Sequence, residues 1–161
     1  MTGEVELRRV LGHFATGVTI VTTTAGGQPH GLTVNAFASL SLEPAQVLVC
    51  LKRGNRSYGA FGAATHFAVN VLGEDQVALS RLFASDRERK FEGLAYRAGP
   101  LSGSPLLDGA HARLECAVAA RLDVAGTHAI VVGSLLGYDL GDGLPLVFHR
   151  GRYHRLGDPI S

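Results

Sequence analysis

The sequence predicts a mainly β protein, an antiparallel barrel with inserted α-helices. About eight short apolar or β-branched segments have the character of strands, and helical spacing occurs in only two or three places. The segments do not alternate in the strand–helix–strand order of a parallel sheet. The chain also holds 21 glycines in 161 residues, and most of them separate the strand-like segments, as expected for a fold with many turns.

The first third of the chain predicts one helix and four strands. Residues 4–14 place apolar side chains at helical spacing, and Gly17 ends this segment. The next strand is β-branched at every position from Val18 to Thr24, and residues 25–28 form a glycine hairpin turn. The predicted strands are 18–24, His30 to about Phe37, 39–42 and 47–51.

The middle of the chain predicts two further helices around one strand. Ser57 is a suitable N-cap for a short helix, and the apolar positions 78, 79, 82 and 83 have helical spacing. Residues 86–90 form a charged, solvated segment, and residues 99–109, which are rich in Gly, Pro, Ser and Leu, form an irregular loop. The predicted elements are helix 57–64, strand 66–72 and helix 75–84.

Two long strands dominate the last third. Residues 110–124 alternate apolar and mostly polar side chains over fifteen positions, which is typical of a curved antiparallel sheet or barrel. Residues 129–138 are apolar on both faces, so this strand is expected to be more deeply covered. Residues 146–148 and 153–154 are expected to be the closing strands.

The composition of the chain argues against several classes of function and location. The chain is 46% hydrophobic, and 15 basic against 14 acidic residues give a formal charge of +1, so electrostatic binding to nucleic acid or membrane is not expected. No apolar run is long enough to span a bilayer, and the acidic N-terminus does not resemble a signal peptide. We expect one cytoplasmic domain over residues 1–161, with Cys50 and Cys116 as small buried hydrophobes.

The sequence lacks the common catalytic and nucleotide-binding motifs. It has no dinucleotide fingerprint, P-loop, nucleophile elbow or zinc-protease motif. His149 and His154 lie five residues apart across a predicted turn, where two surface histidines are expected rather than a metal site. We therefore expect no metal.

Polar side chains inside strand-like segments remain as candidates for a binding site. Thr33, Asn35, Ser39 and Ser41 share one parity and would project to one side of an extended chain. Short hydroxyl and amide groups among aliphatic neighbours can hydrogen-bond a flat heterocycle. An ordinary exposed strand face is the alternative reading of the same pattern.

Two further segments have both a functional and a structural interpretation. Asn55-Arg56-Ser57 at the start of a helix could bind an anion, or could simply cap the helix. His128, in Gly126-Thr127-His128, could contact a ligand or could be an ordinary turn residue.

Together these residues resemble the short-chain flavin reductases, the reductase components of two-component flavin-dependent monooxygenases, which share a flavin-reductase-like split-barrel domain. No single motif is decisive, but the order and spacing of several are specific and extend over nearly the whole chain. The matching motifs are Leu7-x-x-x-Leu11-x-x-Phe14-x-Thr16-Gly17-Val18-Thr19, Gly31-x-Thr33-Val34-Asn35-Ala36-Phe37-x-Ser39-x-Ser41-Leu42-x-Pro44, Phe67-Ala68-Val69-Asn70-Val71-Leu72, Leu114-Glu115-Cys116, Gly126-x-His128, Pro145-Leu146 and Gly151-x-Tyr153.

The resemblance implies a six-stranded Greek-key split barrel that forms a homodimer with flavin near the interface. It implies reduction of free FMN or FAD by NADH or NADPH, with release of the reduced flavin to a partner monooxygenase. It assigns His128 to the nicotinamide nucleotide, Phe91 to covering the flavin ring or the nicotinamide, and Tyr153 to the pocket edge. It assigns Thr33, Val34, Asn35, Ala36, Ser39 and Ser41 to the isoalloxazine and ribityl chain, and Asn55, Arg56 and Ser57 to the flavin phosphate.

Hydride transfer from nicotinamide C4 to flavin N5 needs no protein nucleophile, because the cofactors supply the reactive centres. The absence of a catalytic triad is therefore consistent with this chemistry. Two alternatives remain: a protein that holds FMN tightly as a carrier or store, and another split-barrel oxidoreductase acting on pyridoxine phosphate or a deazaflavin.

Overall fold

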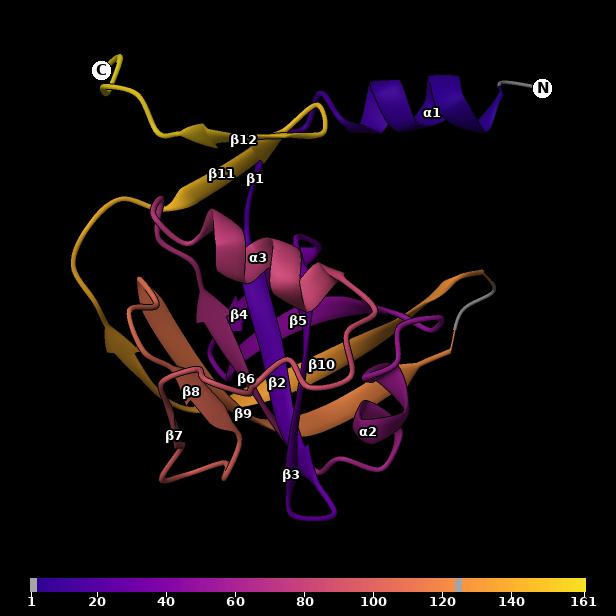
Figure 1. Cartoon of the computed structure of the whole chain (residues 1–161), viewed down its shortest axis with the longest axis vertical. Helices are drawn as coiled ribbons and strands as arrows, with labels where there is room; N and C mark the ends of the chain where they lie inside the picture. The colour runs from indigo at the N-terminus through magenta and orange to yellow at the C-terminus, as the bar shows by residue number, and fades with distance from the viewer. Residues whose placement is uncertain (1–2, 124–125) are drawn as a thin grey trace.

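The computed structural model describes residues 3–123 and 126–161. Within these ranges the chain forms three helices and twelve strands (Figure 1). The helices are α1 (Glu4–Leu11), α2 (Tyr58–Gly62) and α3 (Val77–Ala84). The strands are β1 (Thr16–Gly17), β2 (Thr19–Ala25), β3 (Gln28–Val34), β4 (Phe37–Leu42), β5 (Ala45–Lys52), β6 (His66–Val71), β7 (Tyr96–Ala98), β8 (Pro105–Leu107), β9 (Ala112–Leu122), β10 (His128–Leu140), β11 (Leu146–His149) and β12 (Arg152–Arg155).

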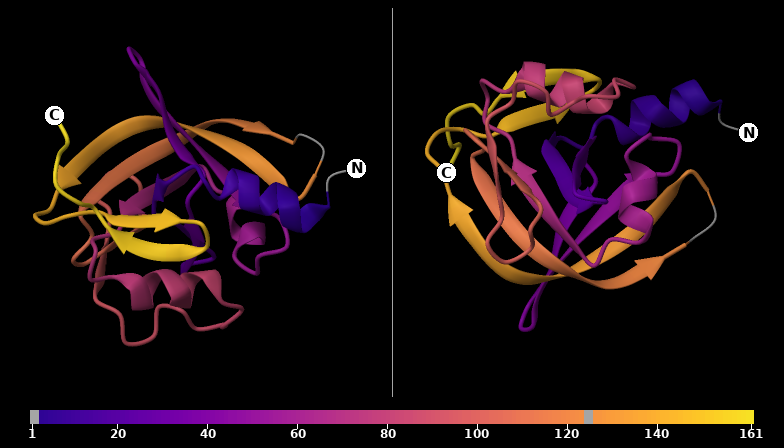
Figure 2. Two further views of the ribbon diagram at one scale, coloured as in Figure 1. Left: turned by 90° about the horizontal axis from the view of Figure 1, so that it is seen from above. Right: turned by 60° about the horizontal axis from the view of Figure 1, so that its bottom comes forward.

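Seven of these strands form one antiparallel sheet that curls into a barrel. The strand order is β3-β2-β6-β9-β10-β5-β4, and the long strands β9 and β10 wrap around the molecule (Figure 2). The two edge strands of the sheet, β3 and β4, meet at one corner because only residues 35–36 join them. The backbone N–H of Cys50 donates to the carbonyl of Ala36 at 2.9 Å and so extends the pairing of β4 with β5 into this corner. The mainly β barrel with inserted helices is therefore confirmed, and the described residues hold more strands than the predicted eight.

Strand alternation divides the interior into two cores. In β2, Val21 points into the barrel while Ile20 points outward beneath α3, and both are fully buried. A strand covered on both faces needs apolar or small side chains at every position, which explains its continuous β-branched run. The barrel core also includes Val47, Val49, Leu51 and Phe67, and the outer core includes Leu72, Phe83 and Leu146.

Residues 99–109 are more ordered than the predicted loop. They contribute β8, which pairs with β7 and is fully buried. The buried side chain of Asn70 holds this hairpin: its Nδ2 donates to the carbonyl of Ile20 at 3.1 Å and its Oδ1 accepts from the N–H of Leu107 at 2.8 Å. The Gly, Pro, Ser and Leu content of residues 99–109 predicted an irregular loop, because local composition carries no information about a partner as distant in sequence as Asn70.

The predicted strand faces differ from the observed ones in β9 and β10. Glu115 belongs to the predicted polar face but is buried, because its carboxylate accepts from the backbone N–H groups of Leu101 and Ser102 at 2.9 and 2.7 Å. Leu136 and Tyr138 are 43% and 74% exposed, so the expected covering of both faces of residues 129–138 is wrong for the single chain. The predicted strand end at Val124 lies outside the described residues.

The charge pattern of residues 86–90 also led to a wrong prediction for the side chain of Lys90. Lys90 belongs to the predicted solvated segment but is buried, and its Nζ donates to the carbonyl of Phe83 at 2.9 Å, next to the C-terminus of α3. Burial lowers the pKa of Lys90, although the nearby carboxylate of Asp86 opposes this shift. The lysine therefore satisfies a helix-end carbonyl rather than facing solvent.

The helix α1 projects from the barrel and buries none of its residues (Figure 1). It ends at Leu11, earlier than the predicted residue 14, and a short segment connects it to β1. The strand β1 pairs with β11, which pairs with β12, in a separate three-stranded sheet. None of the helices in residues 3–123 and 126–161 is long and apolar enough to cross a membrane.

Candidate functional site

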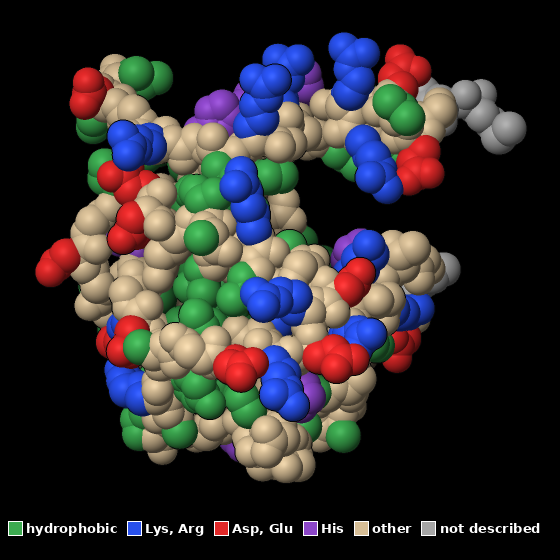
Figure 3. Space-filling view, viewed as in Figure 1, with side chains coloured by type: hydrophobic (Ala, Val, Ile, Leu, Met, Phe, Trp, Pro, Cys, Tyr) green, Lys and Arg blue, Asp and Glu red, His purple; other side chains and the backbone are tan. Residues whose placement is uncertain are grey.

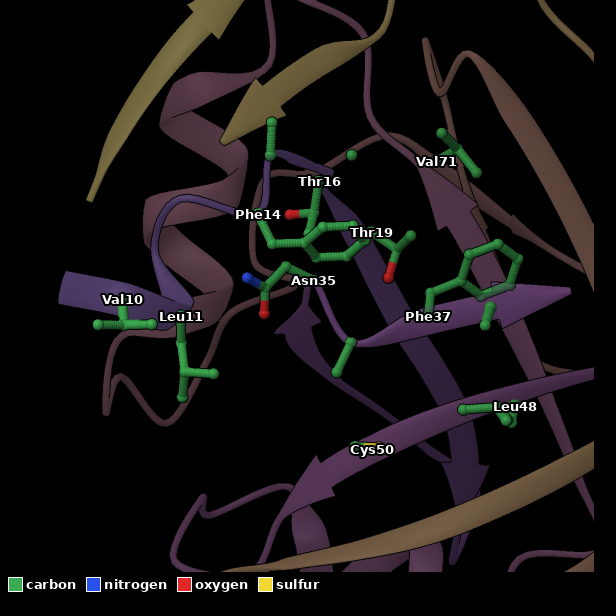
Figure 4. Close-up of a pocket in the computed structure, with 14 residues that line it drawn as sticks. Val10, Leu11, Phe14, Thr16, Thr19, Asn35, Phe37, Leu48, Cys50 and Val71 are labelled. Carbon is green, nitrogen blue, oxygen red and sulfur yellow. The ribbon is translucent and has the colours of Figure 1, made fainter. Parts of the chain in front are cut away.

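A groove of about 1030 Å³ lies between the α1 end of the chain and the barrel. We call it the α1 groove. In Figure 3, α1 and its charged side chains project over a hollow beside the barrel. The residues that line the groove are Val10, Leu11, Phe14, Ala15, Thr16, Gly17, Thr19, Asn35, Ala36, Phe37, Ala38, Leu48, Cys50 and Val71, and Figure 4 draws these side chains.

Strand alternation explains why the groove wall is mostly apolar. In β5, Val49 and Leu51 point into the barrel core, so Leu48 and Cys50 point outward into the groove. The neighbouring β4 contributes Phe37 and Ala38. The lining residues include no Asp, Glu, Lys or Arg, so the groove suits a neutral, flat apolar surface better than a charged group.

Three polar side chains interrupt this wall. The Thr19 hydroxyl donates to the carbonyl of Val34 at 2.6 Å and is therefore already used within the barrel. Asn35 is exposed in the β3–β4 connection, and its amide projects toward the groove (Figure 4). The Thr16 hydroxyl oxygen is buried and has no hydrogen-bond partner within the described ranges. The groove thus offers one exposed amide and, among the residues that the structure describes, one hydroxyl without a hydrogen-bond partner.

The predicted binding wall from Thr33 to Ser41 is only partly brought together. Asn35 and Ala36 line the groove. These two residues lie between the end of β3 and the start of β4, and the pairing register shifts between Ser39 and Ser41. The prediction that the four polar side chains share one face of a single strand is therefore wrong. Thr33 instead donates its hydroxyl to the carbonyl of Ser80 at 2.6 Å, beneath α3.

The remaining members of this wall lie apart from the groove lining. Val34 is buried in the barrel core, and Ser39 and Ser41 lie further along β4, where they pair with Val47 and Gln46 of β5. The parity argument failed because it assumed one continuous strand. A closing barrel needs a sharp change of direction here, and the change separates the two halves.

The segment Asn55–Ser57 does precede a helix, as predicted. Ser57 is the N-cap residue of α2, but its side chain makes no capping hydrogen bond. Instead the Asn55 side-chain oxygen accepts from the Ser57 N–H at 2.9 Å, and Arg56 forms an ion pair with Glu88. The segment follows β5, whose Leu48 and Cys50 line the groove.

Phe91 and Tyr153 both pack against the outer core. The Phe91 ring lies 5.0 Å from the Phe83 ring, edge-on, and is half-buried. The Tyr153 hydroxyl lies 2.9 Å from the Ser80 hydroxyl, and the Arg81 guanidinium lies 5.6 Å from the Tyr153 ring centre. Neither aromatic residue lines the α1 groove.

His128 lies at the start of β10, where it is exposed and its Nδ1 is 2.8 Å from the Thr127 hydroxyl. In the strand register, Ile130 is opposite Cys50 and His128 is opposite Lys52. Residues two apart on a strand share a face. His128 therefore lies on the same sheet face as the groove-lining Cys50, beyond the groove end.

Of the groove-lining residues, only Asn35 and Ala36 were predicted as site residues; the others, which include Phe14, Thr16, Phe37 and Cys50, were assigned no functional role from the sequence. Phe14 and Thr16 belong to the motif that supported the family resemblance, but the resemblance assigned them no role. Cys50 was expected to be a buried hydrophobe, and it is half-buried at the groove surface, whereas Cys116 is fully buried, as expected. Burial raises the pKa of the Cys116 thiol to about 12, which keeps it protonated and unreactive.

Known proteins share both the sequence and the fold. Residues 11–157 match the family described as the flavin reductase like domain. The chain is 42% identical over 148 residues to the reductase component of 4-nitrophenol 4-monooxygenase/4-nitrocatechol 2-monooxygenase from Rhodococcus opacus, covering 92% of this chain and 78% of the relative. It is 44% identical to the FMN reductase (NADH) SmoA of Agrobacterium fabrum, covering 92% and 83%.

A solved structure gives the same relationship in three dimensions. The NADH:FAD oxidoreductase SgcE6 of Streptomyces globisporus, in complex with NAD and FAD fragments, superposes with a TM-score of 0.91 at 35% identity. The alignment covers 98% of this chain and 94% of that one. The sequence match and the shared fold agree, and the chain belongs to the flavin reductase-like domain family.

Proposed function

We propose that this protein reduces FMN or FAD with NADH or NADPH and supplies the reduced flavin to a partner monooxygenase. Family membership over residues 11–157 is the observation that supports this most strongly. The relatives include an FMN reductase (NADH) and the reductase component of a monooxygenase. A bound flavin would supply N5 as the hydride acceptor.

The residues of the α1 groove fit a flavin ring. A flat tricyclic ring needs apolar walls along its faces and a few polar groups at its edge. Leu48, Phe37 and Val71 provide apolar surface, and Asn35 provides an amide that can both donate and accept. The groove faces solvent (Figure 3), which suits a flavin that enters and leaves as a substrate.

The chain's own residues would mainly bind and orient the reactants. Asn35 and Ala36 would contact the ring edge, and Thr33, Val34, Ser39 and Ser41 stay predicted contacts of the ring and ribityl chain. Asn55, Arg56 and Ser57 would receive the flavin phosphate, since β5 leads from the groove wall toward them. His128 would orient the nicotinamide nucleotide from the same sheet face. Phe91 and Tyr153 stay predicted neighbours of the pocket.

We further propose a homodimer that works in the cytoplasm. Large apolar side chains remain exposed, and contiguous exposed apolar surface is typical of an interface; a second copy of this chain is the partner we propose. The exposed residues include Leu40, Leu42, Leu136, Tyr138 and Leu140. The two cysteines are unpaired, as is usual in a reducing compartment. Light scattering of the purified protein tests the dimer, and a monomeric mass would contradict it.

Steady-state oxidation of NADH and NADPH, each with FMN, FAD and riboflavin, tests the proposed reaction. A reductase of free flavin is expected to turn over many flavins per subunit. Turnover limited to one flavin per subunit would identify a carrier instead. A failure of all six combinations, with no flavin binding by fluorescence, would overturn the proposed function.

A further inference from the structure

One hydroxyl in the wall of the α1 groove lacks a hydrogen-bond partner. The Thr16 oxygen is buried and unpaired among residues 3–123 and 126–161. By contrast, the hydroxyls of Thr19 and Thr23 donate to backbone carbonyls at 2.6 and 2.8 Å. Buried polar groups are nearly always paired, so an unpaired one at the surface of a groove needs an explanation.

The side chain of Phe14 offers that explanation. Phe14 is 80% exposed and lies two residues before Thr16, on the segment that joins α1 to β1. Figure 4 shows both side chains at the groove, close to Asn35. A ligand can reach an atom that solvent cannot reach only if a neighbour moves. Phe14 has this freedom, because most of its side chain is exposed and is not packed in either core.

We propose that Thr16 recognises the flavin ring and that Phe14 is the gate in front of it. When Phe14 moves aside, the Thr16 hydroxyl donates a hydrogen bond to a carbonyl oxygen at the edge of the isoalloxazine. The absence of charged residues from the groove lining favours the neutral ring over a phosphate as the acceptor. This inference rests on the proposed function, and it assigns specificity to two residues outside the predicted site.

Replacing the hydroxyl gives a direct test. The variant Thr16→Val keeps the shape and removes the donor, whereas Thr16→Ser keeps the donor. Binding of riboflavin and FMN is measured by quenching of flavin fluorescence, without a nicotinamide nucleotide. We expect Thr16→Val to raise the Kd by about 5- to 10-fold, the size of one lost hydrogen bond. Thr16→Ser is expected to bind like the wild type.

Thermal unfolding separates this role from a structural one. Because the Thr16 hydroxyl has no partner within residues 3–123 and 126–161 of the free protein, Thr16→Val should leave the Tm unchanged or raise it. The matched control is Thr23→Val, whose hydroxyl donates to the carbonyl of His66. We expect that control to lower the Tm and to leave the flavin Kd unchanged. A Tm loss in Thr16→Val as large as that in Thr23→Val would overturn the inference.

Comparing riboflavin with FMN shows whether the Thr16 hydroxyl donates to the flavin ring or to the phosphate. An equal rise in Kd for riboflavin and FMN supports recognition of the ring, because riboflavin has no phosphate. A rise for FMN alone, or an unchanged Kd for both, overturns the inference while the proposed function stands. A wild-type protein that binds neither flavin overturns both.

The gate has a kinetic test of its own. We expect Phe14→Ala to speed the association of riboflavin in stopped-flow fluorescence, since the open form no longer has to be populated first. Phe14→Leu, which keeps a bulky side chain, is the control and should change the rate less. Association that is equally fast or slower in Phe14→Ala overturns the gate.

Discussion

The hydroxyl groups of Tyr153 and Ser80 lie 2.9 Å apart, and this contact joins the C-terminal sheet to α3. Ser80 is fully buried, and its carbonyl also accepts the hydroxyl of Thr33 from β3. One helix residue therefore connects β12, α3 and β3. The small sheet of β1, β11 and β12 forms part of the groove wall through β1, and this contact is one of those that join the sheet to the barrel.

Removing the Tyr153 hydroxyl should therefore lower stability. The variant Tyr153→Phe leaves the buried Ser80 hydroxyl without this partner, at a cost of about 1–3 kcal/mol in the free energy of unfolding. Urea denaturation measures the loss. Tyr138→Phe, at a hydroxyl-bearing ring that is 74% exposed, is the control and should be neutral. Equal midpoints for the two variants would show that the Tyr153 contact is unimportant, and a raised flavin Kd in Tyr153→Phe would favour the pocket role instead.

The close packing of β9 against β10 requires a glycine at position 133. A Cβ added there would lie 2.8 Å from Phe67 Cε1 and 2.9 Å from Cys116 Cβ, inside the barrel core. We expect Gly133→Ala to destabilise the protein by about 1–3 kcal/mol through overpacking. Gly59→Ala is the control, because nothing lies within 4 Å of its added Cβ and alanine favours a helix. Thermal or urea unfolding of both variants decides the question.

Acid should weaken the contact between Asp139 and two arginines. Partial burial raises the pKa of Asp139, but the guanidinium groups of Arg113 and Arg97, at 2.9 and 2.7 Å, outweigh it, so the net pKa lies below its ordinary value. The folded state therefore favours the ionised form of Asp139 more than the unfolded state does. The resulting stability is present above the ordinary aspartate pKa of about 3.9 and is lost as the pH falls through the lowered pKa.

The variant Asp139→Asn tests this dependence. It should unfold at a lower urea concentration than the wild type at pH 7, and the difference should shrink below about pH 4. Asp142→Asn, in the exposed turn after β10, is the control and should follow the wild type at every pH. A difference between Asp139→Asn and the wild type that is independent of pH would contradict the electrostatic explanation.

His128 should affect the nicotinamide nucleotide and not the flavin. We expect His128→Ala to raise the KM for NADH or NADPH and to leave the flavin Kd unchanged, because His128 shares the groove face but lies beyond the groove. The control is His66→Ala, since His66 makes the same type of contact, 2.9 Å from the Thr65 hydroxyl, at the start of another strand. An unchanged KM with weaker flavin binding would refute the assignment.

Local sequence predicted most of the elements because their signals are local. The β-branched run of β2, the glycine turn before β3 and the helical spacing of α3 all formed as expected, and the two central glycines of the turn, Gly26 and Gly27, have positive φ. The errors occur where a distant partner decides. Glu115 and Lys90 are buried because backbone groups elsewhere accept or donate to them, and β8 is a strand because Asn70 holds it.

The sequence by itself determined the class of fold and the family, since both depend on the order and spacing of motifs along the chain. Only the tertiary structure decided the composition of the groove. The connection between β3 and β4 separates Thr33 from Ser39, and the pairing of β4 with β5 brings Cys50 next to Ala36. In the part of the chain that the structure describes, the Thr16 hydroxyl has no hydrogen-bond partner at the groove. The physical reason is that side-chain parity follows one strand only as far as its next break, while a binding surface is made by strands that meet through hydrogen bonds between distant residues.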